Sequence, residues 1–401
     1  MLELEQALEK ILSTVHPASS ELAALNQAHE RISAEKKVSP LDLPPFDNSA
    51  MDGYAVRSAD LKTANADKPV RLKLVGKVAA GSTFDGEVQS GTCARIFTGS
   101  PLPRDADAVV MQEDTRVELL EGILFLDSVK PWENIRLRGE DVKLGDMLVD
   151  AGCRLRAGQI SLLGAVGVRE IEVGVSPVIG LLATGSELLE PPHTLAPGKI
   201  FESNRAMLAA LAARAGAKTK VFPLVPDSLD ATCAALEKAF SECDIVITSG
   251  GVSVGEMDFV KAAFESLGGK MEFWKVAIRP GKPFVFGRWR EKFLFGLPGN
   301  PVSAFVTFVL LVRPAILRWQ GAQSVALVSH PGILAEDFVN RDQRRPHFVR
   351  VIVDEEGKIR SAGVQASHAL SSLAAANGLL EVTPGAVLAA GKTVSVARID
   401  F

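Results

Sequence analysis

The chain has 401 residues, of which 47% are hydrophobic and 23% are charged, and its formal net charge is −4. This length accommodates two to four domains with cores of their own, and the composition is that of an ordinary globular protein. The small negative charge gives no basic surface of the kind that nucleic acid requires. Any anionic ligand must therefore be met by local clusters of Lys and Arg.

The cysteines, the N-terminus and the apolar stretches exclude several other classes of protein. The four cysteines form no Cys-x-x-Cys pair, and the histidines show no metal-ligand spacing, which argues against a structural zinc site or a disulfide framework. The N-terminal MLELEQALEKILSTV has acids where a signal peptide needs a basic start. The most apolar stretch, 302–312, is shorter than the ~20 residues of a membrane span. We expect a cytoplasmic protein with no membrane or nucleic-acid partner.

The first 176 residues combine helical and β-rich segments. An amphipathic helix is predicted over about 3–15, and a second helix around 20–32. A further helical segment is predicted at 157–167. Between these segments short β-rich runs alternate with Gly, Pro and Asp turns, and strands are predicted at 70–78, 92–97, 108–112 and 122–126. This order indicates a discontinuous helical first domain with a β-rich insertion.

From Pro177 onward, strands alternate with helices, which predicts a doubly wound parallel α/β sheet. The predicted strands are 178–183, a run ending at 225, 244–248, 271–279, 283–287 and 292–297. The predicted helices are 204–213 with Gly216 as its stop, 229–240, 258–267, and 301–317 behind the N-cap Asn300 and the N1 residue Pro301. After Gly321 a small β domain is expected, with strands near 347–353, 378–382 and 392–398. Sheets of this kind bind ligands beyond the carboxyl ends of their strands.

Several loops at that edge of the sheet carry acids. These are Glu187, Asp227, and Glu256 with Asp258. Each acid alone is as readily a turn residue or a helix cap. Acids gathered at one crevice repel one another unless a cation lies among them, and Mg²⁺ prefers oxygen ligands and bridges to phosphates. Asp227 and Asp258, on neighbouring loops, therefore favour a metal site, whereas Glu256 is interpreted as an acid stabilised by a helix N-terminus.

Two Gly-rich loops and one cationic segment complete the pattern. Backbone N–H groups of 249–251 and 296–300 can bind anions where helices begin, although glycine also serves any tight turn. In a strand, Lys275 and Arg279 would point to the same face about 13 Å apart, with Lys282 after a Pro-Gly turn. The alternative is a solvated edge. Together the residues indicate an enzyme or binder for a phosphorylated or oxyanionic ligand with a divalent metal.

An ordered set of motifs narrows this further. The motifs are PPFDNSAMDGYAV, RIFTGSPLP, RLRGEDV, LLATGSEL, SNRAML, SGGVSVGEMDF, KVAIRPGKPF and GLPGNPVSAF. Through them the chain resembles, over essentially its whole length, the MoeA/gephyrin E-domain family of molybdopterin molybdenumtransferases. The resemblance implies insertion of molybdenum from molybdate into adenylylated molybdopterin, with release of AMP and a requirement for Mg²⁺. It also implies an elongated homodimer with an active site shared between subunits, and contact with an adenylyltransferase partner.

The resemblance implies a division into domains and a set of site residues. The domains are a discontinuous helical domain (1–45 and 139–176), an inserted β-rich domain (46–138), a molybdopterin-binding α/β domain (177–326) and a C-terminal β barrel (327–401). The implied catalytic residues are Asp52, Asp141, Asp227, Asp258, Lys275 and Arg279. The implied substrate-binding residues are Thr98, Glu187, Ser249, Gly250, Gly251, Pro298, Gly299, Asn300, Pro301, Arg350, Ser367 and Ser371. Asp227, Asp258 and Glu187 are the implied metal ligands.

Two other functions are compatible with parts of this pattern. A molybdopterin adenylyltransferase shares the α/β domain and the SGG loop, but its usual chain is little more than that domain. A non-catalytic scaffold related to the gephyrin E domain would not need the acids and cations, which are all present here. Many members of the family carry Lys where Arg279 stands; Arg offers oxyanions a planar fork and Lys a point charge. The residues do not distinguish molybdenum from tungsten.

Overall fold

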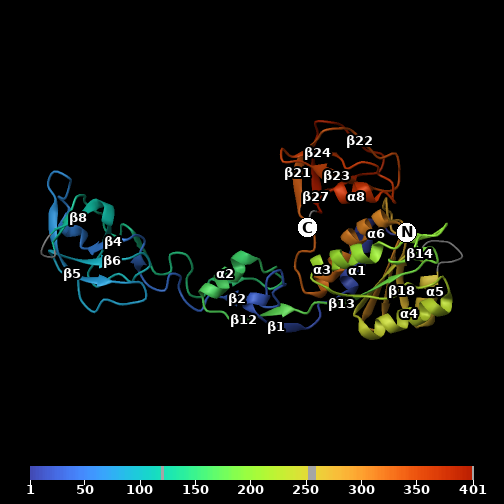
Figure 1. Ribbon diagram of the computed structural model, residues 1–401, viewed down its shortest axis with the longest axis horizontal. Coiled ribbons are helices and arrows are strands. Elements are labelled where there is room, and N and C mark those ends of the chain that lie inside the picture. Colours follow the sequence, from blue (N-terminus) through green and yellow to red (C-terminus); the bar gives the residue numbers. More distant parts are fainter. Residues whose placement is uncertain (119–121, 252–258, 400–401) are drawn as a thin grey trace. The chain divides into compact units, whose positions relative to one another are not determined.

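The computed structural model describes residues 1–118, 122–251 and 259–399. The chain forms two compact units, coloured along the sequence in Figure 1. Unit 1 comprises Met1–Glu35, Ala151–Ile160 and Arg169–Phe401, and unit 2 comprises Lys36–Asp150 and Ser161–Val168. The finer division into four domains stays a prediction.

A six-stranded sheet lies at the centre of unit 1, with strand order β16-β13-β17-β20-β19-β18. The strands are β13 (Val178–Ala183), β16 (Lys218–Val221), β17 (Ile245–Ser249), β18 (Lys270–Trp274), β19 (Val285–Trp289) and β20 (Lys292–Leu297). The first four in this order run parallel, whereas β19 and β18 form an antiparallel edge. The predicted α/β sheet is therefore confirmed, as a mixed sheet.

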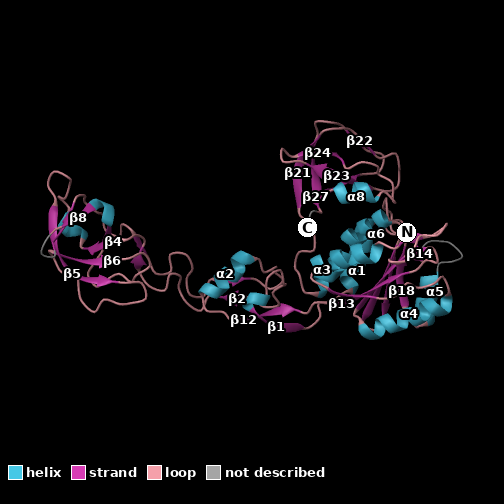
Figure 2. Ribbon diagram, viewed as in Figure 1, coloured by secondary structure: helices cyan, strands magenta, loops and turns pink. Residues whose placement is uncertain are grey.

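Helices cover both faces of this sheet (Figure 2). Neighbouring residues of β17 show the two layers, because Ile245 and Ile247 pack into one core cluster and Val246 into another. The helices of the first cluster are α1 (Leu4–Thr14), α3 (Asn204–Arg214), α6 (Pro301–Thr307) and α7 (Arg313–Trp319). Those of the second are α4 (Leu229–Glu242) and α5 (Phe259–Ser266).

The helix over 301–319 is continuous but contains a π-helical turn, Phe308–Val312, between α6 and α7. Pro314 explains the turn, because it lacks an N–H for the ladder and its ring crowds the carbonyl four residues earlier. Among the described residues this is the one helix long and apolar enough to cross a membrane, with 19 residues. Because 78% of its most apolar window is buried inside the protein, it is a core helix of unit 1.

The N-terminal segment departs from the prediction at one place. The first helix is confirmed as α1, but the helix expected around 20–32 is wrong. That segment forms β1 (Ser20–Ala24) and a short 3₁₀ turn, Leu25–Gln27. β1 pairs antiparallel with β12 (Glu170–Gly174), about 150 residues away along the chain. This distant pairing overrides the local helical preference of an Ala- and Leu-rich stretch.

The C-terminal part of unit 1 is a closed five-stranded barrel, as predicted. In barrel order its strands are β21 (Ser329–Leu334), β24 (Lys358–Ser361), β23 (His347–Val353), β25 (Gly378–Val382) and β27 (Thr393–Arg398). Val349, Val351 and Leu380 lie in its core. A short helix, α8 (Leu370–Ala375), contacts β23 and α6.

Unit 2 contains a second six-stranded sheet, with order β7-β4-β6-β5-β9-β8. Its strands are β4 (Gly53–Val56), β5 (Val70–Val78), β6 (Thr92–Ile96), β7 (Ala108–Met111), β8 (Thr115–Val117) and β9 (Gly122–Phe125). The four predicted strands are thus confirmed as β5, β6, β7 and β9. The helical segment expected at 157–167 is confirmed as α2 (Ala157–Ala165), whose residues up to Ile160 belong to unit 1 and whose remaining residues belong to unit 2. Two short pairs, β2 (Lys37–Val38) with β11 (Met147–Val149) and β3 (Asn48–Ser49) with β10 (Ile135–Arg136), complete the unit.

Candidate functional site

A cavity of about 630 Å³ lies at the carboxyl ends of β13, β17 and β20, and is called the strand-end cavity below. Eight of the predicted site residues line it: Glu187, Asp227, Ser249, Gly250, Gly251, Gly299, Asn300 and Pro301. Pro298 is buried in the same turn as Gly299. The cavity lies where parallel α/β sheets bind ligands, as the sequence predicts.

Three carboxylates line this cavity: Glu202, which is paired with Arg205, and two others that come from different loops. Asp227 follows β16, and its Oδ2 accepts a hydrogen bond from the Ser186 N–H at 2.8 Å, which ties it to the loop after β13 that carries Glu187. That loop continues into a short parallel pair, β14 (Leu188–Leu189) with β15 (Ile200–Phe201). Asp258 and Glu256, the other acids of the prediction, lie outside the described residues.

The SGG loop after β17 requires its glycines. Gly250 and Gly251 have φ of +87° and +66°, which side chains rarely adopt. A Cβ on Gly250 would come within 2.6 Å of the Thr184 carbonyl oxygen, and one on Gly251 within 2.7 Å of Thr184 Oγ1. The bare backbone thus packs against Thr184 and lines the cavity. Such turns, with the N-terminus of α6 at Asn300, form a concave site for an anion.

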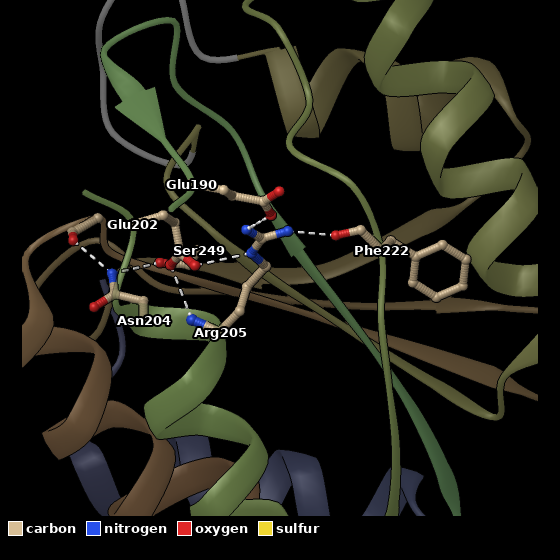
Figure 3. A network of polar contacts seen from close by, with 7 residues as sticks. Glu190, Glu202, Asn204, Arg205, Phe222 and Ser249 are labelled. Carbon is tan, nitrogen blue, oxygen red and sulfur yellow. Dashed lines mark hydrogen bonds and ion pairs between the residues drawn. The ribbon is translucent and has the colours of Figure 1, made fainter. Parts of the chain in front are cut away.

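Asn204, at the start of α3, joins the two loops of this site (Figure 3). Its Nδ2 donates to Ser249 Oγ at 2.7 Å and to the Gly299 carbonyl at 2.7 Å. A carbonyl can only accept, so the amide nitrogen must face Gly299. Its Oδ1, like Thr184 Oγ1, is buried and has no hydrogen-bond partner among the described residues. Both atoms belong to residues that line the cavity, and because neither atom is itself exposed, a ligand would satisfy them after a local shift of the wall.

Arg205 fixes the segment that frames the cavity. Its side chain is 5% exposed and donates from Nε to Glu202 Oε2 at 2.9 Å, with further contacts to Glu190 and the Phe222 carbonyl (Figure 3). Glu202 is 6% exposed. The SNRAML motif alone predicts no role for Asn204 or Arg205. An Arg at the start of an Ala- and Leu-rich helix is the sequence signal that could have identified them.

A second cavity, of about 420 Å³, lies between the 278–283 loop and the barrel, and is called the barrel cavity below. Arg279, Lys282, Arg345, His347 and Ser367 are among the residues that line it. The loop is fastened to β23, because the Arg279 N–H donates to the Pro346 carbonyl at 2.9 Å and the Phe348 N–H donates to the Arg279 carbonyl at 2.8 Å. His368 lines both this cavity and the strand-end cavity.

The prediction that Lys275 and Arg279 share one face of a strand is wrong. β18 ends at Trp274, and Lys275 has φ of +72°. Beyond it the backbone pairs elsewhere: the Val276 N–H donates to the Lys282 carbonyl, and the Ala277 N–H to Leu2. Arg279 therefore reaches the barrel cavity, whereas Lys275 lies over the Trp274 ring, 3.8 Å from its centroid, and lines neither cavity. Lys261, near the start of α5, contacts the same ring.

Arg350 is placed behind the barrel cavity rather than in its wall. Its guanidinium is fully buried and donates from Nε to Ser372 Oγ at 3.1 Å. Its Nη2 donates to the carbonyls of Val364 and Ala366, at 2.8 and 3.2 Å. Burial lowers the pKa of this guanidinium. Arg350 thus holds the loop that carries Ser367, while Ser371 is exposed on α8 and lines neither cavity.

Three of the predicted residues lie in unit 2. Asp52 Oδ1 accepts two hydrogen bonds from Thr98, from its N–H and from its Oγ1, both at 2.8 Å. These hydrogen bonds hold the pKa of the Asp52 carboxyl below its usual value. Asp141 lies on another loop of the unit, where its N–H donates to the Leu43 carbonyl at 3.0 Å. All three residues are exposed.

The described residues contain no group of three or more His, Cys, Asp or Glu side chains gathered to hold a metal ion. Glu187 and Asp227, in the strand-end cavity, are nevertheless two carboxylates in one crevice. Mg²⁺ is commonly held by one or two carboxylates together with substrate phosphates and water. The donor set therefore fits a Mg²⁺ ion that arrives with a phosphorylated ligand.

Three family models match the chain in order and together span most of it. They are "MoeA N-terminal region (domain I and II)" over residues 2–167, "Probable molybdopterin binding domain" over 180–318, and "MoeA C-terminal region (domain IV)" over 332–399. The match to the second model includes the loops of the strand-end cavity, and the match to the third includes β23 and α8.

Relatives and solved structures match over the full length. The molybdopterin molybdenumtransferase of Haemophilus influenzae is 40% identical, over 99% of this chain and 98% of that protein. The enzyme of the same name from Bacillus subtilis is 35% identical, over 99% and 94%. A crystal structure of a molybdopterin biosynthesis MoeA protein from Pyrococcus horikoshii OT3 superimposes with a TM-score of 0.85 and 32% identity, over 100% of both chains.

Proposed function

Because the chain belongs to the MoeA family of molybdopterin molybdenumtransferases, we propose that it inserts molybdenum from molybdate into adenylylated molybdopterin and releases AMP. The chain is a transferase of molybdenum-cofactor biosynthesis that binds molybdopterin. The observation that carries the finer proposal is the pair of cavities, one lined by acids and glycine loops and the other by cations, with His368 in the wall of both.

The strand-end cavity is the proposed site of the phosphorylated pterin. The backbone N–H groups of Gly251, Gly299 and Asn300 would bind its phosphate, because these residues line the cavity. The Gly250 N–H already donates to the Leu297 carbonyl, and the Val302 N–H to the Ser367 carbonyl. Asn204 and Thr184 supply buried polar atoms that lack partners among the described residues. Asn204 also holds the two loops in fixed positions relative to each other through its hydrogen bonds to Ser249 and Gly299. These fixed positions would orient the substrate for reaction.

Glu187 and Asp227 are the proposed Mg²⁺ ligands, together with Asp258. When bound, Mg²⁺ would neutralise phosphate charge and favour cleavage of the pyrophosphate bond. The Ser186 N–H holds Asp227 in place at 2.8 Å, which preorganises this carboxylate toward the cavity. The role of Asp258 stays a prediction.

The barrel cavity is the proposed site of molybdate. Arg279 and Lys282 would supply positive charge to the oxyanion, and Ser367 a hydroxyl donor. The planar fork of Arg279 suits an oxyanion with two adjacent acceptor oxygens. Arg350 acts through the 364–366 segment that it holds. Lys275 is proposed to attract the anionic substrates from its position over Trp274, beside α5.

Asp52, Thr98 and Asp141 are proposed to complete the active site of the partner subunit in a homodimer. The hydrogen bonds from Thr98 favour the ionised form of Asp52 and fix the orientation of its carboxylate. A group that acts on the substrate of another subunit would need both properties. We further propose that the chain works in the cytoplasm, where an adenylyltransferase partner would supply the adenylylated pterin.

The test is molybdate-dependent release of AMP from adenylylated molybdopterin by purified protein. Asp227→Asn removes one charge from the strand-end cavity and is expected to lower the rate about 100-fold. Asp230→Asn is the matched control, because Asp230 is exposed three residues away, in the first turn of α4, and should leave the rate unchanged. Asp258→Ala should also slow the reaction.

Two outcomes would contradict the assignment. Equal rates for Asp227→Asn and Asp230→Asn would remove Asp227 from the site. Rapid adenylylation of molybdopterin in the presence of ATP and Mg²⁺, with no molybdate-dependent AMP release, would instead indicate an adenylyltransferase.

A further inference from the structure

His347 is a buried polar side chain in the wall of the barrel cavity. It is the first residue of β23 and is 7% exposed. Its Nε2 is buried and has no hydrogen-bond partner among the described residues. Buried polar atoms are nearly always hydrogen-bonded in folded proteins, so the unpartnered nitrogen of this cavity-lining residue is one that a ligand can satisfy after a small shift of the ring.

The charges around His347 determine which ligand that is. Arg279 forms a β-bridge with it, Arg350 lies three residues along β23, and Arg345 and Lys282 line the same cavity. The nearby acid is Asp342, whose Oδ2 accepts from Arg345 Nε at 2.7 Å, so the charges of these two residues offset each other. The remaining charges are the positive ones of Arg279, Arg350 and Lys282. The surroundings are cationic, so they repel a cation and attract an anion.

The same surroundings keep the imidazole neutral. Burial, followed by the charges of Arg279 and Arg350, lowers the pKa of His347 to about 4. At neutral pH the ring thus carries one proton, and the hydrogen bond that its Nε2 can make selects the tautomer. A neutral N–H donor beside two cations matches a tetrahedral oxyanion, because it adds a directed hydrogen bond without adding charge.

We propose that His347 is an oxyanion-binding residue of the barrel cavity, donating from Nε2 to a tetrahedral oxyanion held by Arg279 and Lys282. This rests on the proposed function, which places such an oxyanion there. The chemistry is shared by molybdate and by a phosphate group of the nucleotide. A bound dianion favours the charged imidazolium, so binding should raise the pKa of His347.

The test uses the full chain and follows the imidazole C–H signals by NMR, with the His347 signal assigned by its loss in His347→Gln. Sodium molybdate and inorganic phosphate are titrated separately at constant ionic strength. We expect one oxyanion to shift the His347 signal to saturation and to raise its pKa by about one unit or more. Saturation by molybdate identifies the metal substrate, and saturation by phosphate identifies the nucleotide as the source.

Variants separate hydrogen bonding from packing. His347→Gln keeps a side-chain N–H donor and should retain oxyanion affinity within about threefold, whereas His347→Phe keeps a ring but no donor and should lose about tenfold or more. His330→Phe is the matched control, because His330 is exposed on β21 of the same barrel. Its affinity should equal that of the wild type.

The two proposals fail in different ways. If Arg279→Ala abolishes binding while His347→Phe binds like the wild type, the role of His347 is overturned and the oxyanion site stands. If neither oxyanion shifts the His347 signal of the wild type, and Arg279→Ala gives the same titration curves as the wild type, the oxyanion site of the proposed function is overturned as well. The wild-type titration needs no variant, so the inference stays testable if His347→Phe does not fold.

Discussion

Acidification should destabilise unit 1 through His347. The folded-state pKa of this residue is about 4, against an ordinary value of 6.5, because the imidazole is buried among arginines. Between these two values the unfolded chain binds a proton that the folded chain does not, so stability rises with pH across this window. The contribution is complete above pH 6.5 and is lost as the pH falls toward 4.

The magnitude follows from the size of the shift. A difference of 2.5 pKa units corresponds to about 3.4 kcal/mol, fully lost below pH 4, and about 2 kcal/mol of this is lost at pH 5. The side chain is 7% exposed, so solvent screening removes little of it. This loss is a large part of the stability of an ordinary domain.

The assay is urea unfolding at pH 7.5 and at pH 5.0, without oxyanions in the buffer. Trp132→Phe provides the background, because Trp132 lies in unit 2 and the other three tryptophans lie in unit 1, whose unfolding they then report. In this background, the further change His347→Gln should reduce the loss of stability on acidification by about 2 kcal/mol. Other groups titrate equally in both proteins, so the difference isolates His347. Identical pH dependence in the two proteins would refute the reasoning.

Two further predictions concern the strand-end cavity. Arg205→Met should lower the free energy of unfolding by about 3–5 kcal/mol in urea titrations, because it leaves Glu202 buried and unpaired. Adding Glu202→Gln should restore part of that loss. A loss below about 1 kcal/mol would contradict the importance of the buried pair. Gly250→Ala should weaken AMP binding about tenfold or more in calorimetric titrations, because the new Cβ meets the Thr184 carbonyl at 2.6 Å in a left-handed conformation; unchanged affinity would show that the loop does not hold the phosphate.

Much of the α/β part could be predicted from the sequence because its signals are local. Alternating apolar runs and Gly or Pro stops located the strands of the central sheet, and Asn300 with Pro301 marked the start of α6. Buried parallel strands must be apolar on both faces, so they stand out from the loops between them. The carboxyl ends of those strands then indicated where ligands bind, and the strand-end cavity lies there.

The failures have one physical cause, which is pairing with a distant segment. Ser20–Ala24 forms a strand because Glu170–Gly174 offers it a partner. The backbone beyond Trp274 leaves the sheet because Leu2 and Lys282 offer hydrogen bonds to it. Glu170–Gly174 and Leu2 lie outside a window of ten or fifteen residues, whereas Lys282 is close in sequence. In both places the local pattern favoured the wrong structure.

The same limit applies to side chains in the site. Residue type and spacing gave the acids and glycines of the strand-end cavity, but could not separate residues in a cavity wall from those behind it. Arg350 is fully buried, its Nη2 donates to the 364–366 segment and its Nε to Ser372, and Ser371 is exposed on α8. Asn204 and Arg205, in contrast, frame the cavity although no role was predicted for them. Hydrogen-bond partners decide these roles, and only the fold supplies the partners.

The separation of charge between the two cavities follows from the proposed reaction. Both substrates are anions, and two anions held side by side repel each other unless each is neutralised by its own groups. Carboxylates that hold Mg²⁺ would repel the oxyanion if they lay beside it without the metal. The Arg and Lys side chains that bind the oxyanion directly are therefore expected in a separate cavity. The chain places Glu187 and Asp227 in one cavity and Arg279 and Lys282 in the other, with His368 in the wall of both. In the proposed arrangement, a substrate whose phosphate lies in the strand-end cavity would meet the oxyanion at this shared wall. There, a neutral His347 would add a hydrogen-bond donor without adding charge.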